Sequence, residues 1–157
     1  MILVTVGTNE TSFDRLLRAL EALPETEELV VQHGPSGVRP PRATCFDYLP
    51  FDELTAYMRR ARVVVTHAGV GSIIAALSNG KRAIVVPRLA RHGEAVDDHQ
   101  LHFGRRAEQA GLVELVEDPA TLAEAVARHE QRPVAEIGGD NRLVEDLREY
   151  LSARIGR

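Results

Sequence analysis

The strongest fold signal in the chain lies at residues 63–77, which read VVVTHAGVGSIIAAL. Three valines and a threonine form a short β-branched run, which is typical of a strand buried on both faces of a parallel sheet. A glycine-rich turn follows, and the apolar residues from Ile73 onward favour a buried helix. This order of strand, turn and helix predicts an α/β domain around a parallel sheet.

The same alternation continues on both sides of this stretch. Including residues 63–66, six strands are predicted, at Ile2–Val6, Glu28–His33, Ala43–Tyr48, Val63–Thr66, Ala83–Pro87 and Leu112–Val116. Helical spacing predicts helices from Phe13 to Leu23, before Pro24, and at Asp52–Ala61, Ser72–Asn79, His99–Ala110 and Ala120–Glu130. The expected architecture is a Rossmann-like parallel sheet flanked by helices.

The chain length fits one domain, since 157 residues are close to the usual domain size. We expect this domain to span residues 1–131. Residues 132–140 contain proline and two adjacent glycines and are predicted to be a linker. Residues 141–157 carry an apolar stripe at helical spacing, so they are predicted to form a C-terminal helix that packs either on this domain or on a partner.

Charge and cysteine content exclude several classes of function. The 19 Lys and Arg residues against 23 Asp and Glu give a formal net charge of −4, so we expect no nucleic-acid partner. The single cysteine, Cys45, allows no internal disulfide and favours a cytoplasmic location. No stretch approaches the ~18 apolar residues of a membrane span, so membrane contact is expected only through a partner.

The glycine-rich turn at residues 67–72 is the first candidate site. A turn of this kind leaves backbone N–H groups free at a helix N-terminus, where the helix dipole also favours an anion such as a diphosphate. Gly69 and Gly71 permit close approach of the backbone, Ser72 either caps the helix or donates to a phosphate oxygen, and His67 points into the same crevice. The alternative is a tight turn in which the glycines only satisfy backbone geometry.

Two better-known glycine motifs do not fit this chain. A dinucleotide-binding fingerprint needs a small residue where Ile74 stands, and a Walker loop needs Ser or Thr after the lysine of Gly80-Lys81-Arg82. The sequence therefore favours neither a nicotinamide cofactor nor ATP hydrolysis, and no cofactor is predicted.

A second polar segment, residues 87–100, follows the next predicted strand. In a parallel sheet this loop should lie beside the His67 turn, at the carboxyl ends of the strands. The alternative for its two adjacent aspartates is a solvated helix cap. Two candidate contacts are cations that suit a phosphate or a sugar carboxylate, Arg88 and Arg91. Four others have donors or acceptors that suit sugar hydroxyls: Glu94, Asp98, His99 and Gln100.

The histidines raise a metal hypothesis, because His99 and His102 lie one helical turn apart. No His-Glu-x-x-His pattern occurs, and Cys45 has no thiol partner. No metal site is predicted. A flavodoxin-like hydrolase that uses these histidines with a metal stays open as an alternative, to be tested by metal analysis.

At these residues the chain resembles the C-terminal, donor-binding domain of family 28 glycosyltransferases, one half of a two-domain GT-B enzyme. It is most similar to the stand-alone donor-binding subunits of two-part glycosyltransferases, as in bacterial exopolysaccharide synthesis. Four blocks carry the resemblance, in the family's order: Val4–Thr8 followed by Phe13; Phe46–Phe51 with Met58; Thr66–Ser72; and Pro87–Arg91 with Gly93, Glu94 and Asp98–Gln100.

The resemblance implies a role for each block. Gly7 and Thr8 would lie by the nucleotide phosphates, and Tyr48, Leu49 and Phe51 would support the uracil ring. The diphosphate would bind at His67, Gly69, Gly71 and Ser72, with His67 and Ser72 as the catalytic pair that stabilises the departing diphosphate. His99 and Gln100, with Asp98 beside them, would contact the sugar. Many relatives hold the ribose with a glutamate where this chain has Ala75, so Glu94 is expected to replace it.

The resemblance also implies the reaction. The chain would transfer a hexose or a uronic acid from a UDP-sugar to a polyprenyl-diphosphate-linked saccharide, without a metal. It would act only with a membrane-anchored acceptor-binding subunit, at the cytoplasmic face of the membrane. A uronate would pair with Arg88 and Arg91. A non-catalytic nucleotide-sugar-binding or assembly protein of the same fold is the alternative, and Ala75 favours it.

Overall fold

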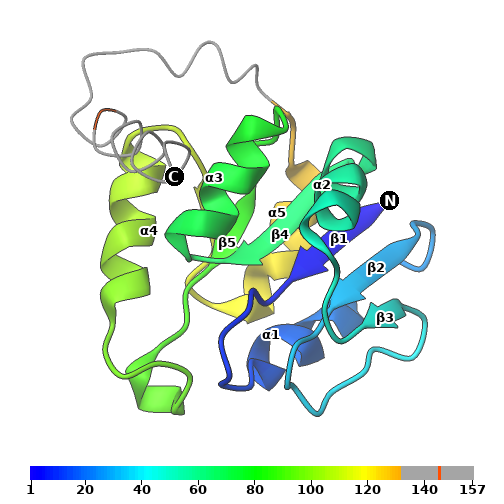
Figure 1. The fold of residues 1–157 in the computed structure, drawn as a ribbon, viewed down its shortest axis with the longest axis horizontal. Helices are drawn as coiled ribbons and strands as arrows, with labels where there is room; N and C mark the ends of the chain where they lie inside the picture. The colour runs from blue at the N-terminus through cyan, green and yellow to red at the C-terminus, as the bar shows by residue number, and fades with distance from the viewer. Residues whose placement is uncertain (132–144, 146–157) are drawn as a thin grey trace.

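The computed structural model describes residues 1–131 and Glu145. These residues contain the whole predicted sheet (Figure 1). The predicted linker at 132–140 and the predicted helix at 141–157 lie outside the described residues, apart from Glu145.

Six parallel strands form one sheet, in the order β3-β2-β1-β4-β5-β6. Each predicted strand is confirmed. Five are one to three residues shorter than predicted, because their terminal residues already belong to the loops, and the fourth extends one residue further, to His67. The strands are β1 (Ile2–Thr5), β2 (Leu29–Gln32), β3 (Thr44–Phe46), β4 (Val63–His67), β5 (Ile84–Val86) and β6 (Glu114–Leu115).

Helices connect the strands. The first predicted helix is α1 (Asp14–Ala19), which tightens into a 3-10 turn at Leu20–Ala22 before Pro24. The others are α2 (Phe51–Arg60), α3 (Val70–Ser78), α4 (His99–Gln109) and α5 (Leu122–Arg128), with 3-10 turns η2 (Ala90–His92) and η3 (Pro119–Thr121).

The start of α3 corrects one prediction. Gly69 is extended, with φ −84° and ψ 136°, and is the N-cap of the helix, which begins at Val70. Ser72 therefore lies inside the first turn and does not cap it. A glycine serves as the N-cap here because the chain must pass close to the His67 ring, where a side chain has no room.

Alternate residues of each strand pack on opposite faces of the sheet, so the core has two layers. Val4 and Val65 face α1 and α5, whereas Leu3 and Val64 face α2, α3 and α4. In Figure 1, α2 and α3 lie in front of the sheet. Both faces are buried, which explains why the strand sequences are almost continuously apolar.

The direction of strand progression reverses between β1 and β4. From β1 the chain adds β2 and β3 on one side, and then crosses over to add β4, β5 and β6 on the other. The connections that leave β1 and β4 therefore diverge to opposite faces, and a crevice opens between them at the carboxyl edge of the sheet.

Candidate functional site

A cavity of about 500 Å³ lies at this reversal point. Its walls come from the ends of β1, β2 and β4, the loop after β1, one face of α2 and the first turns of α3. The lining residues are Thr5, Gly7, Thr8, Asn9, Gln32, Phe51, Leu54, Met58, His67, Gly71, Ser72 and Ala75. Of the predicted site residues, the structure brings Gly7, Thr8, Phe51, His67, Gly71 and Ser72 together here.

The N-terminus of α3 forms one wall of the cavity. The first turn of an α-helix leaves its amides without partners inside the helix. The N-cap, Gly69, provides no side-chain hydrogen bond to them. Gly71 and Ser72 lie in that turn and line the cavity. Free amides and the positive end of the helix dipole therefore face the cavity beside a hydroxyl group.

His67, the last residue of β4, lies between two glycines. A Cβ atom on Gly7 would be 2.3 Å from Cε1 of the ring, and one on Gly69 would be 2.2 Å from Nε2. Gly7 also has a φ of +77°, in the left-handed region that favours glycine. Both glycines are therefore required by the position of the imidazole, which brings the loop after β1 and the start of α3 close together.

The imidazole is neutral at physiological pH. Burial lowers the pKa of His67 from 6.5 to about 4, and the nearby positive charge of Arg88 acts in the same direction. Its Nδ1 lies 3.3 Å from Oγ1 of Thr66. When that hydroxyl donates to Nδ1, Nε2 carries the proton. His67 can then donate a hydrogen bond to an anion, but it contributes no positive charge.

Gln32 is a site residue that the sequence analysis missed. This residue is 2% exposed and lies at the end of β2. Its Nε2 donates to the Gly7 carbonyl at 3.3 Å, and its Oε1 accepts from the Leu49 amide at 3.2 Å. Gln32 thus links the loop after β1 to the loop before α2. The sequence feature that could have indicated a role for Gln32 is its amide side chain at the carboxyl end of an apolar strand.

Asn9 was also missed. It lines the cavity from the loop after β1, and its Oδ1 accepts a hydrogen bond of 2.7 Å from the Thr11 amide. An asparagine two residues before that amide is typical of an Asx turn. The turn directs the loop so that Gly7, Thr8 and Asn9 all border the cavity.

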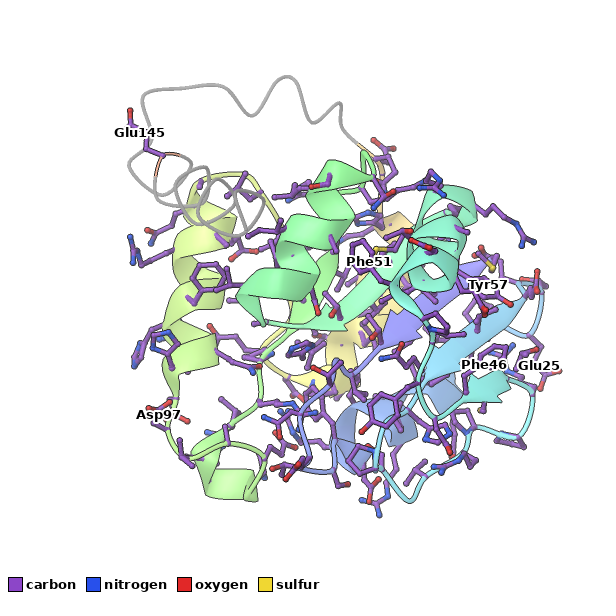
Figure 2. All side chains as sticks on the ribbon, in the orientation of Figure 1. Glu25, Phe46, Phe51, Tyr57, Asp97 and Glu145 are labelled. Carbon is purple, nitrogen blue, oxygen red and sulfur yellow. The ribbon has the colours of Figure 1, made fainter. Side chains whose placement is uncertain are left out.

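The opposite wall is the N-terminal half of α2. Phe51 is 68% exposed although it is a large apolar residue, and it lines the cavity with Leu54. The Phe46 and Tyr57 rings, 6.1 Å apart, pack β3 against this helix (Figure 2). Two other predicted base contacts, Tyr48 and Leu49, are not among the residues that line the cavity.

The described lining of the cavity carries no Asp, Glu, Lys or Arg. Ala75 lies on the α3 wall, and Glu94, which was expected to bind ribose, lies elsewhere. The Glu94 side chain is buried, accepts from Arg15 at 2.8 and 2.9 Å and accepts from the Leu89 amide at 3.0 Å. Internal hydrogen bonds thus occupy the Glu94 carboxylate and hold it outside the cavity lining, and the ribose role expected for Glu94 stays an untested prediction.

Arg88 is also held by internal hydrogen bonds. Its side chain is 0% exposed, and its guanidinium donates to main-chain carbonyls rather than facing the cavity. Arg91 is exposed and lines another cavity, of about 430 Å³, with Arg15 and His92. Neither of the two arginines that were expected to bind a phosphate or a sugar carboxylate is thus among the residues that line the cavity.

The remaining polar residues lie at the start of α4. Asp98 accepts a hydrogen bond of 3.0 Å from the Ala90 amide, and Gln100 accepts one of 3.1 Å from the Arg88 amide. Asp97 accepts a hydrogen bond of 2.9 Å from the His99 amide at the start of α4, which agrees with the alternative that the two adjacent aspartates cap this helix. Figure 2 shows Asp97 well apart from Phe51 of the cavity. Asp98, His99 and Gln100 belong to the same edge of the sheet but not to the cavity lining.

Two further properties concern the part of the chain that the structure describes. Within it, no three His, Cys, Asp or Glu residues are grouped closely enough to hold a metal ion. None of its helices has the length and apolar character that a membrane crossing requires.

Comparison with known families agrees with this geometry. The model of the glycosyltransferase family 28 C-terminal domain matches residues 1–137. The chain belongs to this family. A curated relative of the family 28 domain is the UDP-N-acetylglucosamine transferase subunit ALG13 of Yarrowia lipolytica, which is 28% identical over 130 residues. The match covers 78% of this chain and 62% of that protein.

Solved structures confirm the fold of the family 28 domain. The calicheamicin glycosyltransferase CalG4 superposes with a TM-score of 0.59 at 21% identity, over 99% of this chain and 44% of that one. The glycosyltransferase of kitacinnamycin gives 0.54 at 21% identity, over 95% and 38%. SnogD from Streptomyces nogalater gives 0.52 at 19% identity, over 81% and 32%. This chain therefore has the fold of less than half of each of these larger enzymes.

Proposed function

We propose that this family 28 domain is the UDP-sugar-binding, catalytic subunit of a two-part glycosyltransferase. The observation that carries the proposal is the N-terminus of α3, which faces a cavity beside a neutral imidazole and opposite an exposed aromatic ring. A nucleoside diphosphate has the matching chemistry, with two phosphates and a flat base. The relative ALG13 is named as a subunit of a UDP-N-acetylglucosamine transferase, which supports both the donor class and the need for a partner.

In this proposal the diphosphate binds the amides of Gly71 and Ser72 at the start of α3. Sugar transfer leaves negative charge on the departing diphosphate, and donors that are already oriented stabilise this charge without reorganising. The Ser72 hydroxyl and Nε2 of His67 each donate one hydrogen bond. The charge is thus balanced by main-chain dipoles and neutral donors, since the described lining has no cationic side chain.

The base and the ribose extend from the diphosphate across the cavity in this proposal. The uracil lies against Phe51, whose ring is exposed at the start of α2. Thr8 and Asn9, on the loop after β1, are the polar neighbours of the ribose, where Ala75 offers no hydrogen bond. The sugar points toward the start of α4, where Asp98 and His99 are exposed.

The acceptor lies outside this chain in the same proposal. The chain spans 62% of the length of ALG13 and less than half of each compared structure. We propose that a partner supplies the acceptor site, because ALG13 is named as a subunit of its transferase. We propose a membrane-anchored partner that holds a polyprenyl-diphosphate-linked saccharide, as in exopolysaccharide synthesis. The transferred group in this proposal is a hexose or a uronic acid, and Arg88, which was expected to pair with a uronate, is not among the residues that line the cavity.

Titration of the purified chain with UDP tests the donor site. We expect binding, and we expect Ser72→Ala to raise the Kd about tenfold, because a hydrogen bond to a charged group contributes ~1.5–3 kcal/mol. Ser78→Ala is the matched control, since Ser78 is an exposed serine at the other end of α3. Calorimetry measures both constants. A parent chain that does not bind UDP, or equal losses in the two variants, would contradict the proposal.

A second pair of variants tests the base-binding wall. Phe51→Ala is expected to weaken UDP binding by about tenfold, because stacking on an aromatic ring contributes ~1–3 kcal/mol per base. The free energy of unfolding should change little, since most of the Phe51 ring is exposed. Tyr48→Ala, which removes an aromatic ring 50% exposed and outside the cavity lining, is the control. If Tyr48→Ala weakens UDP binding and Phe51→Ala does not, the base lies elsewhere.

A further inference from the structure

One buried arginine side chain contacts both ends of the loop that follows β1. Arg88 lies just beyond β5, is 0% exposed, and has its guanidinium 4.7 Å from the centroid of the buried Phe13 ring. Burying a cation costs free energy, and an apolar residue of similar volume is often as good for stability alone. Because stability alone does not explain a buried arginine, we expect one beside a candidate ligand site to help fix the geometry of that site.

The hydrogen bonds of Arg88 show what it holds. Its Nη2 donates to the Val6 carbonyl at 3.1 Å. Its Nη1 donates to the Thr11 carbonyl at 2.8 Å and lies 3.2 Å from the Ser12 carbonyl. Val6 and Thr11 are the residues on either side of the Gly7–Glu10 loop, and Gly7, Thr8 and Asn9 line the donor cavity. The planar guanidinium of Arg88 thus donates hydrogen bonds to the main chain at both ends of this loop.

The arginine is itself held on a second loop. Its amide donates to Oε1 of Gln100 at 3.1 Å, and Nη1 lies 3.4 Å from the Glu94 carbonyl. Burial lowers the pKa of Arg88, and the nearby carboxylate of Glu94 acts in the opposite direction. Arg15 pairs with that carboxylate at 2.8 Å. The loop after β1 and the loop after β5 belong to the same edge of the sheet (Figure 1). The Arg88 side chain therefore links these two loops.

We propose that Arg88 is a positioning residue of the donor site, and that its guanidinium holds the Gly7–Glu10 loop against His67 before the nucleotide binds. This inference rests on the proposed function, since the loop borders the cavity assigned to the UDP-sugar. Arginine suits the role because its five N–H donors form a rigid planar fork. Lysine carries the same charge, but all its donors radiate from one atom and cannot reach both ends of the loop.

Arg88 has a second, electrostatic effect on the same site. Its charge adds to burial in lowering the pKa of His67. Around the ring lie Thr66, Gly7 and Gly69, which carry no charge, and Glu94 with Arg15 lies beyond Arg88. The geometric and the electrostatic effects can be separated, because a lysine retains the charge and loses the fork.

The test compares Arg88→Met and Arg88→Lys in the full chain. NMR titration of the ligand-free protein follows the His67 imidazole, and calorimetry gives the Kd for UDP. In Arg88→Met we expect the His67 pKa to rise and the Kd to rise at least tenfold. In Arg88→Lys we expect the pKa to stay low while the Kd still rises at least fivefold. Arg15→Gln, which leaves the bonds to Val6 and Thr11 in place, should change the Kd less than twofold.

UDP binding by either Arg88 variant with the parent Kd would overturn the proposal. If neither variant folds, the parent chain decides: the amides of Gly7–Glu10 should be ordered on the nanosecond timescale without nucleotide, and ordering only after UDP is added would overturn it. A parent chain that is ordered there and does not bind UDP would instead refute the proposed function, so the two failures are distinguishable.

Discussion

Gly7→Ala and Gly69→Ala should each disable the donor site, with the largest effects that we expect from single methyl additions in this chain. Their Cβ atoms would lie 2.3 and 2.2 Å from the buried His67 ring, so the ring or the backbone must move. Overpacking costs ~1–3 kcal/mol, and a left-handed backbone at position 7 adds ~1–2 kcal/mol for a residue other than glycine. Urea denaturation should show losses of about 2–5 kcal/mol for Gly7→Ala, and UDP binding should be abolished or nearly so.

Gly37→Ala is the control for this prediction. The nearest atom to its added Cβ is Oδ2 of Asp14 at 3.9 Å, which is ordinary van der Waals contact. A double-mutant cycle gives a sharper test, because removing the ring removes the clash. In a His67→Ala background, Gly69→Ala should cost much less than in the parent chain. Equal costs in both backgrounds would show that the ring does not require a glycine at position 69.

Stability should depend on pH through His67. Its pKa is about 4 in the folded protein and 6.5 without burial, so the unfolded chain binds the proton more readily between these values. The free energy of unfolding should therefore be highest above pH 6.5 and fall as the pH drops toward 4. At about 1.4 kcal/mol per pKa unit, the loss attributable to this ring is ~3 kcal/mol. Urea denaturation at pH 4.5, 5.5, 6.5 and 7.5 measures it.

His67→Gln isolates this contribution, because glutamine is polar but does not titrate in this range. Its stability curve should be flatter than that of the parent between pH 4.5 and 6.5. Arg62 and Arg105 lower the pKa values of Glu27 and Glu117, respectively. The contribution of these two carboxylates to the free energy of unfolding is therefore lost only at still lower pH, and equally in both proteins. Parallel curves for the two proteins would mean that the imidazole is not held neutral by its surroundings.

The sequence predicted the features of this fold that depend on neighbours along the chain. The β-branched run at 63–66 followed by the glycine turn required only local propensity, and it placed His67, Gly71 and Ser72 at the carboxyl edge of the sheet. The resemblance added Gly7, Thr8 and Phe51, which line the same cavity. The structure begins α3 at Val70, two residues before the predicted start at Ser72. The cap is Gly69 because only glycine fits beside the His67 ring, and this tertiary contact cannot be predicted from local sequence.

Arg88 shows what the sequence could not predict. An arginine after a strand reads as a surface cation, and its burial depends on carbonyls that lie 76 to 82 positions earlier. The internal pairing of Glu94 could not be predicted for the same reason, since its partner Arg15 is 79 positions away. Gln32 was missed because a single amide at the end of an apolar strand is indistinguishable from an ordinary strand boundary. Each of these roles arises from contacts between distant segments.

The amides at the start of α3 belong to the main chain, and this has an evolutionary consequence. A point mutation can delete a lysine or an arginine in one step, but no single codon change deletes a peptide N–H other than a change to proline. An anion site of this kind survives extensive drift, while the residues around it are free to change. Under the proposed function, descendants of this domain can therefore exchange one sugar or acceptor for another and still bind the departing diphosphate through the same main-chain amides.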